Sequence, residues 1–158
     1  MLRAVYKSGS ACILPKSNDI DYLYYYDTND ERIEALIKNT IRDKDIHFKL
    51  LKNAKRVFLG CYIYPFMEHI EGEEIDFSDF SIFNEDIKAQ YIPLLKHYTE
   101  ILDRESKLWY HIFIAVKMYQ KGGIKLTKTE LKTAQKIHDE GVNCDVYNSI
   151  IDYLRELK

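Results

Sequence analysis

Residues 8–26 contain two short polar motifs and then an aromatic run: Ser8-Gly9-Ser10, Asp19-Ile20-Asp21 and Tyr22-Leu23-Tyr24-Tyr25-Tyr26. Glycine and serine form a turn with little side-chain bulk, which can approach a phosphate and offer it N–H groups and a hydroxyl. The aromatic run predicts a strand that includes the aspartates. On a strand, Asp19 and Asp21 would project from one face, where two carboxylates can share Mg²⁺. The pattern therefore predicts metal-assisted chemistry on a phosphate.

Each motif alone also has an ordinary structural explanation. A Gly-Ser pair is a common turn, and Asp-x-Asp is usually found in a solvated loop or at a helix cap. The two motifs are more specific together, because the strand-like segment Leu2–Tyr6 leads directly into the turn. We therefore favour the phosphate-binding interpretation.

The segments Ser8-Gly9-Ser10 and Ser17-Asn18-Asp19-Ile20-Asp21-Tyr22 resemble the signature of the polymerase-β-type nucleotidyltransferase superfamily. The similarity is greatest to its small stand-alone members in bacteria and phages. A looser similarity to their helical half covers Lys107–His111, Gly122–Thr127 and Ile137–Asp139. The spacer between the two motifs is shorter than usual and lacks the second glycine that many members carry.

The resemblance implies an α+β fold in which a small mixed sheet with a flanking helix precedes a helical C-terminal half. It implies an enzyme that moves a nucleoside monophosphate from a nucleoside triphosphate to a hydroxyl acceptor and releases pyrophosphate. Asp19 and Asp21 would hold Mg²⁺ or Mn²⁺. A third carboxylate commonly comes from a later strand, and by position Asp45 is the first candidate and Asp76 the alternative.

The same resemblance implies the phosphate contacts. The Gly9 amide and the Ser10 hydroxyl would hold the β- and γ-phosphates. Lys16 borders the loop, and Lys107 begins a helical segment expected to face the nucleotide. ATP is the default triphosphate, and the acceptor stays open between an RNA 3′ end, a protein side chain and a small molecule.

Local patterns predict the order of elements. Strands are expected at Leu2–Tyr6, Ile20–Tyr26 and Asp45–Leu51, with a helix after the capping-box pattern Thr28–Glu31. The acidic stretch 68–79 is interpreted as a solvated connector. We place the boundary after it, which gives a catalytic lobe at residues 1–83 and a helical lobe at residues 84–158.

Four helices are expected in the second half. Apolar residues repeat at helical spacing from Ile87 to Leu102, across Pro93, and again from Leu108 to Tyr119, before Gly122-Gly123. The third helix begins at the capping box Thr127–Glu130 and stops at Gly141, and Asn143 caps the last. His111 is interpreted as a hydrogen-bonded histidine of the core or its boundary. His138 and Asp139 are adjacent on a helix, so they are expected to point apart.

Composition limits the classes of function. The net charge is −2, which argues against a general polyanion binder and leaves room only for a local basic patch. Three scattered cysteines without a signal peptide indicate the cytoplasm, and no apolar stretch is long enough to span a bilayer. The alternative function is a catalytically silent module that acts through protein interaction, of a phage–host or toxin–antitoxin type. The shorter spacer favours this alternative, and the intact Asp-x-Asp counts against it.

Overall fold

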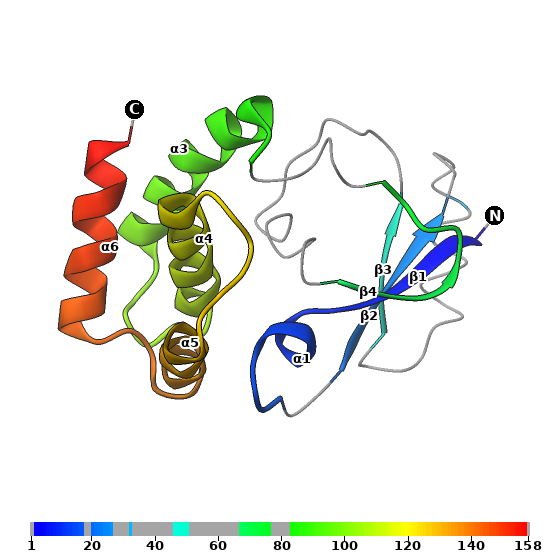
Figure 1. Cartoon of the computed structure of the whole chain (residues 1–158), viewed down its shortest axis with the longest axis horizontal. Helices are drawn as coiled ribbons and strands as arrows, with labels where there is room; N and C mark the ends of the chain where they lie inside the picture. Colours follow the sequence, from blue (N-terminus) through cyan, green and yellow to red (C-terminus); the bar gives the residue numbers. More distant parts are fainter. Residues whose placement is uncertain are drawn as a thin grey trace. The chain divides into compact units, whose positions relative to one another are not determined.

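The computed structural model describes residues 2–17, 20–26, 32, 46–50, 67–76 and 83–157 (Figure 1). These residues cluster into two compact units. The strand unit comprises the described residues up to 50 together with 67–76, and the helical unit comprises 83–157. The α+β class expected from the sequence is confirmed, and the boundary at residues 83–84 stays a prediction. No helix in the described ranges is both long and apolar enough to cross a membrane.

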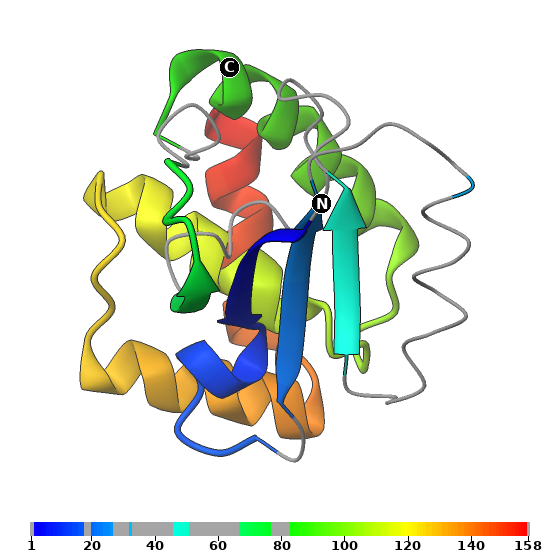
Figure 2. The ribbon, with the colours of Figure 1, turned by 90° about the vertical axis from the view of Figure 1, so that its right-hand side faces the viewer.

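The strand unit contains a four-stranded mixed sheet in the order β3-β2-β1-β4 (Figure 2). Strand β1 is antiparallel to both of its neighbours, whereas β2 and β3 are parallel. The three strands predicted from the sequence are confirmed, with their ends shifted by one or two residues. The bounds of the four strands are Leu2–Ser8 (β1), Asp21–Tyr26 (β2), Ile46–Leu50 (β3) and Glu68–Gly72 (β4).

The middle residues of β1 are apolar on both faces of the strand. Ala4, Val5 and Tyr6 are consecutive and all buried, so packing covers side chains on both faces. Ala4 and Tyr6 pack against Met67 and Ile75. The Tyr6 hydroxyl also accepts a hydrogen bond of 2.7 Å from the Ile75 amide, which ties the chain after β4 to the sheet.

The interpretation of residues 68–79 as a connector was wrong for their first part, because Glu68–Gly72 forms β4. All five residues of β4 are exposed, so the segment has no apolar alternation that would have predicted a strand. Its place in the sheet comes from backbone pairing with β1, where Lys7 lies opposite Glu68 and Ala4 lies opposite Gly72. Acidic side chains are compatible with such an exposed edge position.

The helical unit contains the four helices that the sequence predicted: α3 (Glu85–Ile101), α4 (Trp109–Lys121), α5 (Lys128–Glu140) and α6 (Cys144–Glu156). Pro93 lies inside α3 on its exposed side and does not split the helix. The core is built around Trp109, which is fully buried and donates a hydrogen bond of 2.8 Å from Nε1 to the Asp103 carbonyl. The other large, fully buried side chains of this unit are Tyr91, Leu95, Ile112, Ile114, Met118, Ile150 and Leu154.

The helix ends follow the predicted capping residues. The Thr127 hydroxyl accepts from the Glu130 amide at 3.1 Å, and the Glu130 carboxylate accepts from the Thr127 amide at 2.9 Å. The Asn143 side chain accepts from the Val146 amide and caps α6. Gly141 has a φ of 84°, and a Cβ there would lie 2.5 Å from the Arg104 carbonyl oxygen. Only glycine therefore fits at the end of α5.

Candidate functional site

The candidate site begins at Gly9, which connects β1 to the short helix α1 (Ser10–Ile13). Gly9 has φ 76° and ψ −155°, a backbone conformation that is essentially restricted to glycine. The residue is also buried. The glycine in the Gly-Ser motif is therefore required by the geometry of the turn.

The Gly-Ser turn continues into a single turn of helix. The Cys12 amide donates to the Gly9 carbonyl at 3.1 Å, and the Leu14 amide donates to the Ser10 carbonyl at 2.8 Å. No side chain caps α1 at its beginning. Backbone N–H groups at the start of a helix attract anions, so this end of α1 has the chemistry to meet a phosphate.

The Ser10 hydroxyl links the turn to the chain that leads into the second motif. Its side chain is only 8% exposed, and its Oγ lies 2.9 Å from the Ser17 Oγ. This hydrogen bond holds the two ends of the loop 10–17 together. To bind a phosphate, the Ser10 hydroxyl would exchange its bond with Ser17 for one to the ligand.

Strand pairing brings the separate motifs to one end of the sheet. Ser8, which directly precedes the glycine turn, pairs with Asp21, the first residue of β2. Tyr22 pairs with Ile46, the first residue of β3. The glycine turn, the start of β2 and the start of β3 therefore lie at the same sheet end.

The structure describes only some of the predicted carboxylate residues. Asp21 opens β2, while Asp19 and Asp45 lie outside the described residues. Asp76 is described and exposed, and it follows β4, which leaves the sheet where Gly72 pairs with Ala4. The register thus brings the start of β3, and not the end of β4, beside Asp21. This arrangement favours Asp45 over Asp76 as the third carboxylate.

Glu68 is a charged residue near this site that the sequence reasoning missed. Its carboxylate lies 3.7 Å from the Lys7 Nζ, one residue before the end of β1. Burial raises the pKa of the nearby Cys12 thiol, and the positive charge of Lys7 opposes that rise. Cys12 is therefore a protonated thiol at neutral pH and not a nucleophile. No periodicity in residues 68–72 could have revealed the contact, because it depends on the pairing of β4 with β1.

The two predicted lysines lie in different units. Lys16 is exposed in the loop that follows α1. Lys107 is exposed in the helical unit, two residues before α4 begins, so the expectation that it begins this helix was wrong. The pKa of Asp139 is lowered first by hydrogen bonds from His138 and Gln135, and to a smaller extent by the charge of Lys107.

The expectation that His138 and Asp139 point apart was also wrong. The His138 Nδ1 lies 3.0 Å from the Asp139 Oδ1. Gln135, four residues before Asp139, donates to both oxygens of the same carboxylate at 3.2 Å. This contact along the helix face holds the carboxylate where the neighbouring imidazole can reach it. The pair lies at the surface, with Asp139 55% exposed.

His111 lies close to this pair and stays neutral at pH 7. Burial, together with the charge of His138, lowers the pKa of His111 to about 4. The ring of Tyr110 lies close to both histidines, with its centroid 4.1 Å from that of His111 and 5.2 Å from that of His138. His111 therefore acts as a partly buried neutral side chain and not as a cation at the protein surface.

The donor chemistry at the sheet end fits a hard divalent cation, because the predicted ligands are carboxylates. Among the described residues, no three His, Cys, Asp or Glu side chains gather closely enough to hold a metal ion. Two of the three predicted carboxylates, Asp19 and Asp45, lie outside that set. Comparisons with protein-family models, curated proteins and solved structures find no match to this chain.

Proposed function

We propose that this protein is a Mg²⁺-dependent nucleotidyltransferase that moves a nucleoside monophosphate from a triphosphate to a hydroxyl acceptor. The observation that supports this proposal is the strand register. Ser8 pairs with Asp21, and Tyr22 pairs with Ile46, so a glycine-specific turn and the starts of two strands lie at one sheet end. A phosphate-binding turn beside carboxylates is the arrangement that such a transfer needs.

Each part of this sheet end has a proposed role. The start of α1 at Ser10 binds the β- and γ-phosphates through backbone N–H groups and the hydroxyl. Asp19, Asp21 and Asp45 hold the metal, and Asp45 is the candidate to accept the acceptor's proton. Bound Mg²⁺ would neutralise phosphate charge and lower the pKa of the attacking hydroxyl.

The proposed reaction is an in-line displacement. The acceptor oxygen forms a bond to the α-phosphorus while the bond from that phosphorus to the bridging α–β oxygen breaks. Pyrophosphate leaves with the bonding electron pair, and the acceptor proton passes to a carboxylate or to water. Positioning and charge neutralisation supply most of the acceleration, because no covalent enzyme intermediate is needed.

A transfer assay tests the proposal directly. The protein is incubated with labelled ATP, GTP, CTP and UTP and Mg²⁺ or Mn²⁺, and pyrophosphate release and label transfer are measured. The double variant Asp19→Asn/Asp21→Asn should lose both signals while it keeps the circular dichroism spectrum of the wild type. Glu74→Gln is the matched control, because Glu74 is an exposed carboxylate in the chain after β4. Equal turnover by the double variant and the wild type would refute the proposal.

The second candidate is a catalytically silent module that acts through protein interaction. The hydrogen bond between Ser10 and Ser17 favours it, because the hydroxyl predicted to bind phosphate already has a protein partner. In the same assay, this candidate predicts no transfer by the wild type with any triphosphate. It also predicts that a partner protein binds the Asp19→Asn/Asp21→Asn variant and the wild type equally.

A further inference from the structure

The helical unit has a strongly uneven distribution of charge. Residues 117–136 contain six lysines and one acidic residue, Glu130, in a chain whose net charge is −2. The Glu130 carboxylate already has partners, since it completes the capping box of α5 and pairs with Lys121. Lys128 and Lys132 therefore have little local compensation, whereas Lys136 lies four residues before Glu140 on the same helix face.

Three of these lysines form a row on the exposed side of α5. Lys128, Lys132 and Lys136 follow each other at intervals of four residues, and all three are exposed. On a helix this spacing repeats a positive charge every ~6 Å along the axis. The opposite side of α5 is buried through Ala134 and Ile137, so the row faces solvent.

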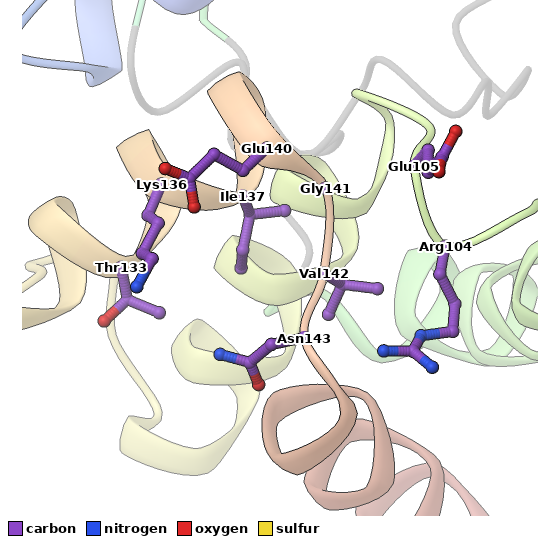
Figure 3. Close-up of a pocket in the computed structure, with 9 residues that line it drawn as sticks. All are labelled: Arg104, Glu105, Thr133, Lys136, Ile137, Glu140, Gly141, Val142 and Asn143. Atoms are coloured by element: carbon purple, nitrogen blue, oxygen red, sulfur yellow. The ribbon is translucent and has the colours of Figure 1, made fainter.

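The row continues into a pocket formed by α5, the start of α6 and the connection between α3 and α4. The pocket has a volume of about 570 Å³ and is lined by nine residues, including Lys136, Thr133, Asn143 and Arg104. Figure 3 shows Lys136 and Arg104 on opposite sides of the pocket, with Asn143 between them. The pocket also carries two carboxylates, those of Glu105 and Glu140.

Among the described residues, these cations form no ion pair with a carboxylate. In the described part of the chain, the ion pairs with a nitrogen-to-oxygen distance of at most 4.0 Å do not include Lys128, Lys132, Lys136 or Arg104. Arg104 instead has its guanidinium over the Tyr147 ring, 5.8 Å from the centroid. Lysines four residues apart on a helix repel each other, so this row lowers the stability of α5.

We infer that the lysine row of α5, together with Arg104, binds the phosphate backbone of a single-stranded nucleic acid. Lysine and arginine side chains neutralise and contact the phosphates in nucleic-acid complexes. The lysine positions follow each other at ~6 Å along the helix axis, which is less than the ~8 Å over which salt screens charges at physiological ionic strength, so their potentials add. The net charge of −2 for the whole chain does not reveal this local basic surface.

The chemistry of the row favours a nucleic acid over a membrane. Between the lysines, the exposed side of α5 carries the polar residues Thr129 and Thr133, and its apolar residues face the core. A helix that lies on a lipid surface needs apolar side chains to insert below the headgroups. The exposed side of α5 carries charged and hydroxyl groups but lacks the apolar side chains that such insertion needs.

Binding is measured by fluorescence anisotropy with labelled oligo(U) and oligo(dT) of about 16 nucleotides, the upper site size of small single-strand-binding domains. The triple variant Lys128→Gln/Lys132→Gln/Lys136→Gln should bind at least ~10-fold more weakly at low salt. The slope of log K against log salt should become less negative by about 2, since each lost contact on a single strand contributes about 0.7. Arg104→Gln should weaken binding by a smaller factor.

Two controls separate binding from folding and from total charge. Lys88→Gln removes one positive charge from α3, where Lys88 pairs with Glu85, and should leave the affinity unchanged. Glu140→Gln removes a carboxylate from the pocket and should strengthen binding. Glutamine and lysine have similar helix propensities, so the triple variant should fold, and relief of repulsion should make it at least as stable as the wild type.

The inference does not rest on nucleotide transfer, since the Asp19→Asn/Asp21→Asn variant should bind both oligonucleotides as the wild type does. Equal binding of oligo(U) and oligo(dT) supports recognition of the shared backbone, and tighter binding of oligo(U) adds a contact to the 2′-hydroxyl. The inference is overturned if the triple variant binds as tightly as Lys88→Gln. It is equally overturned if the wild type binds anionic phosphatidylserine vesicles and neither oligonucleotide.

Discussion

Ser8 pairs with Asp21 across the antiparallel strands β1 and β2, directly before the Gly9 turn. The loop between these two residues contains both the start of α1 and most of the Asp-x-Asp motif. Closing this loop therefore places a helix beginning next to a carboxylate-bearing strand end.

The backbone of the turn should not tolerate a side chain at Gly9. Gly9→Ala forces an L-residue into φ 76° and ψ −155°, at a cost on the order of 1–3 kcal/mol. We expect a lower urea midpoint and, under the proposed function, a higher KM for the triphosphate. Gly123→Ala is the control, because a Cβ there has no atom within 4 Å among the described residues and Gly123 has no positive φ. Equal destabilisation by both substitutions would contradict the role assigned to Gly9.

The third carboxylate can be identified by comparing two conservative variants. Because β3 starts beside Tyr22, Asp45→Asn should lower kcat of the proposed transfer by about 100-fold or more, in the range expected for loss of a group that acts on transition-state charge. Asp76→Asn should leave kcat within about 3-fold of the wild type. Steady-state transfer assays with Mg²⁺ measure both values. A large loss in Asp76→Asn alone would reverse the assignment.

The buried His111 should make stability depend on pH. Burial lowers its pKa from 6.5 to about 4, so the unfolded chain binds more protons than the folded chain between these values. Above pH 6.5, the neutral imidazole contributes up to about 3 kcal/mol to the free energy of unfolding. This contribution is lost as the pH falls toward 4. Urea unfolding of the wild type and of His111→Gln across this range measures the difference.

The control for that measurement is His97→Gln, because His97 is an exposed histidine on α3. It should leave the pH dependence of unfolding as it is in the wild type, whereas His111→Gln should flatten it. The same slope in all three proteins would show that carboxylates, and not His111, dominate the acid response.

Two tyrosines should respond in opposite directions to removal of the hydroxyl. The Tyr119 hydroxyl is buried without a hydrogen-bond partner in the described part of the chain, and burial, first among the causes, raises its pKa far above the usual range. Tyr119→Phe removes a hydroxyl that loses its hydrogen bonds to water on folding and gains none in return. The substitution should therefore raise the free energy of unfolding by ~1 kcal/mol.

Tyr6→Phe is the matched substitution in the strand unit. It removes the hydroxyl that accepts from the Ile75 amide at 2.7 Å and leaves that amide without this partner. The free energy of unfolding should fall by about 1–3 kcal/mol. Urea denaturation followed by circular dichroism measures both variants, and a loss of stability in Tyr119→Phe would contradict the burial argument.

The helical unit was predictable because its signals are local. The capping box at Thr127 and Glu130, the cap at Asn143 and the glycines at Gly122 and Gly141 act through hydrogen bonds and backbone angles within a few residues. Residue type and spacing alone therefore located both ends of α5 and the start of α6. The lysine row of α5 is local in the same sense, since a spacing of four residues places side chains on one helix face.

The candidate site was only partly predictable. The motif located Gly9 and Ser10 at a turn before a strand, because glycine is needed for its φ and aromatic residues favour a strand. Glu68 was missed, because its segment is exposed at every position and shows no strand periodicity. The contact between His138 and Asp139 was missed as well, since it depends on Gln135 holding the carboxylate.

The sequence by itself determined the first three strands, the four helices of the helical unit, the helix caps and the need for glycine at residue 9. These features depend on side-chain shape, hydrogen-bonding groups and apolar period over short distances. Only the tertiary structure decided that β4 pairs with β1, that β3 starts beside β2, and that Arg104 faces Lys136 across a pocket. Such contacts join residues far apart in the chain, and backbone hydrogen bonding between strands carries no residue-specific signal that a single sequence displays.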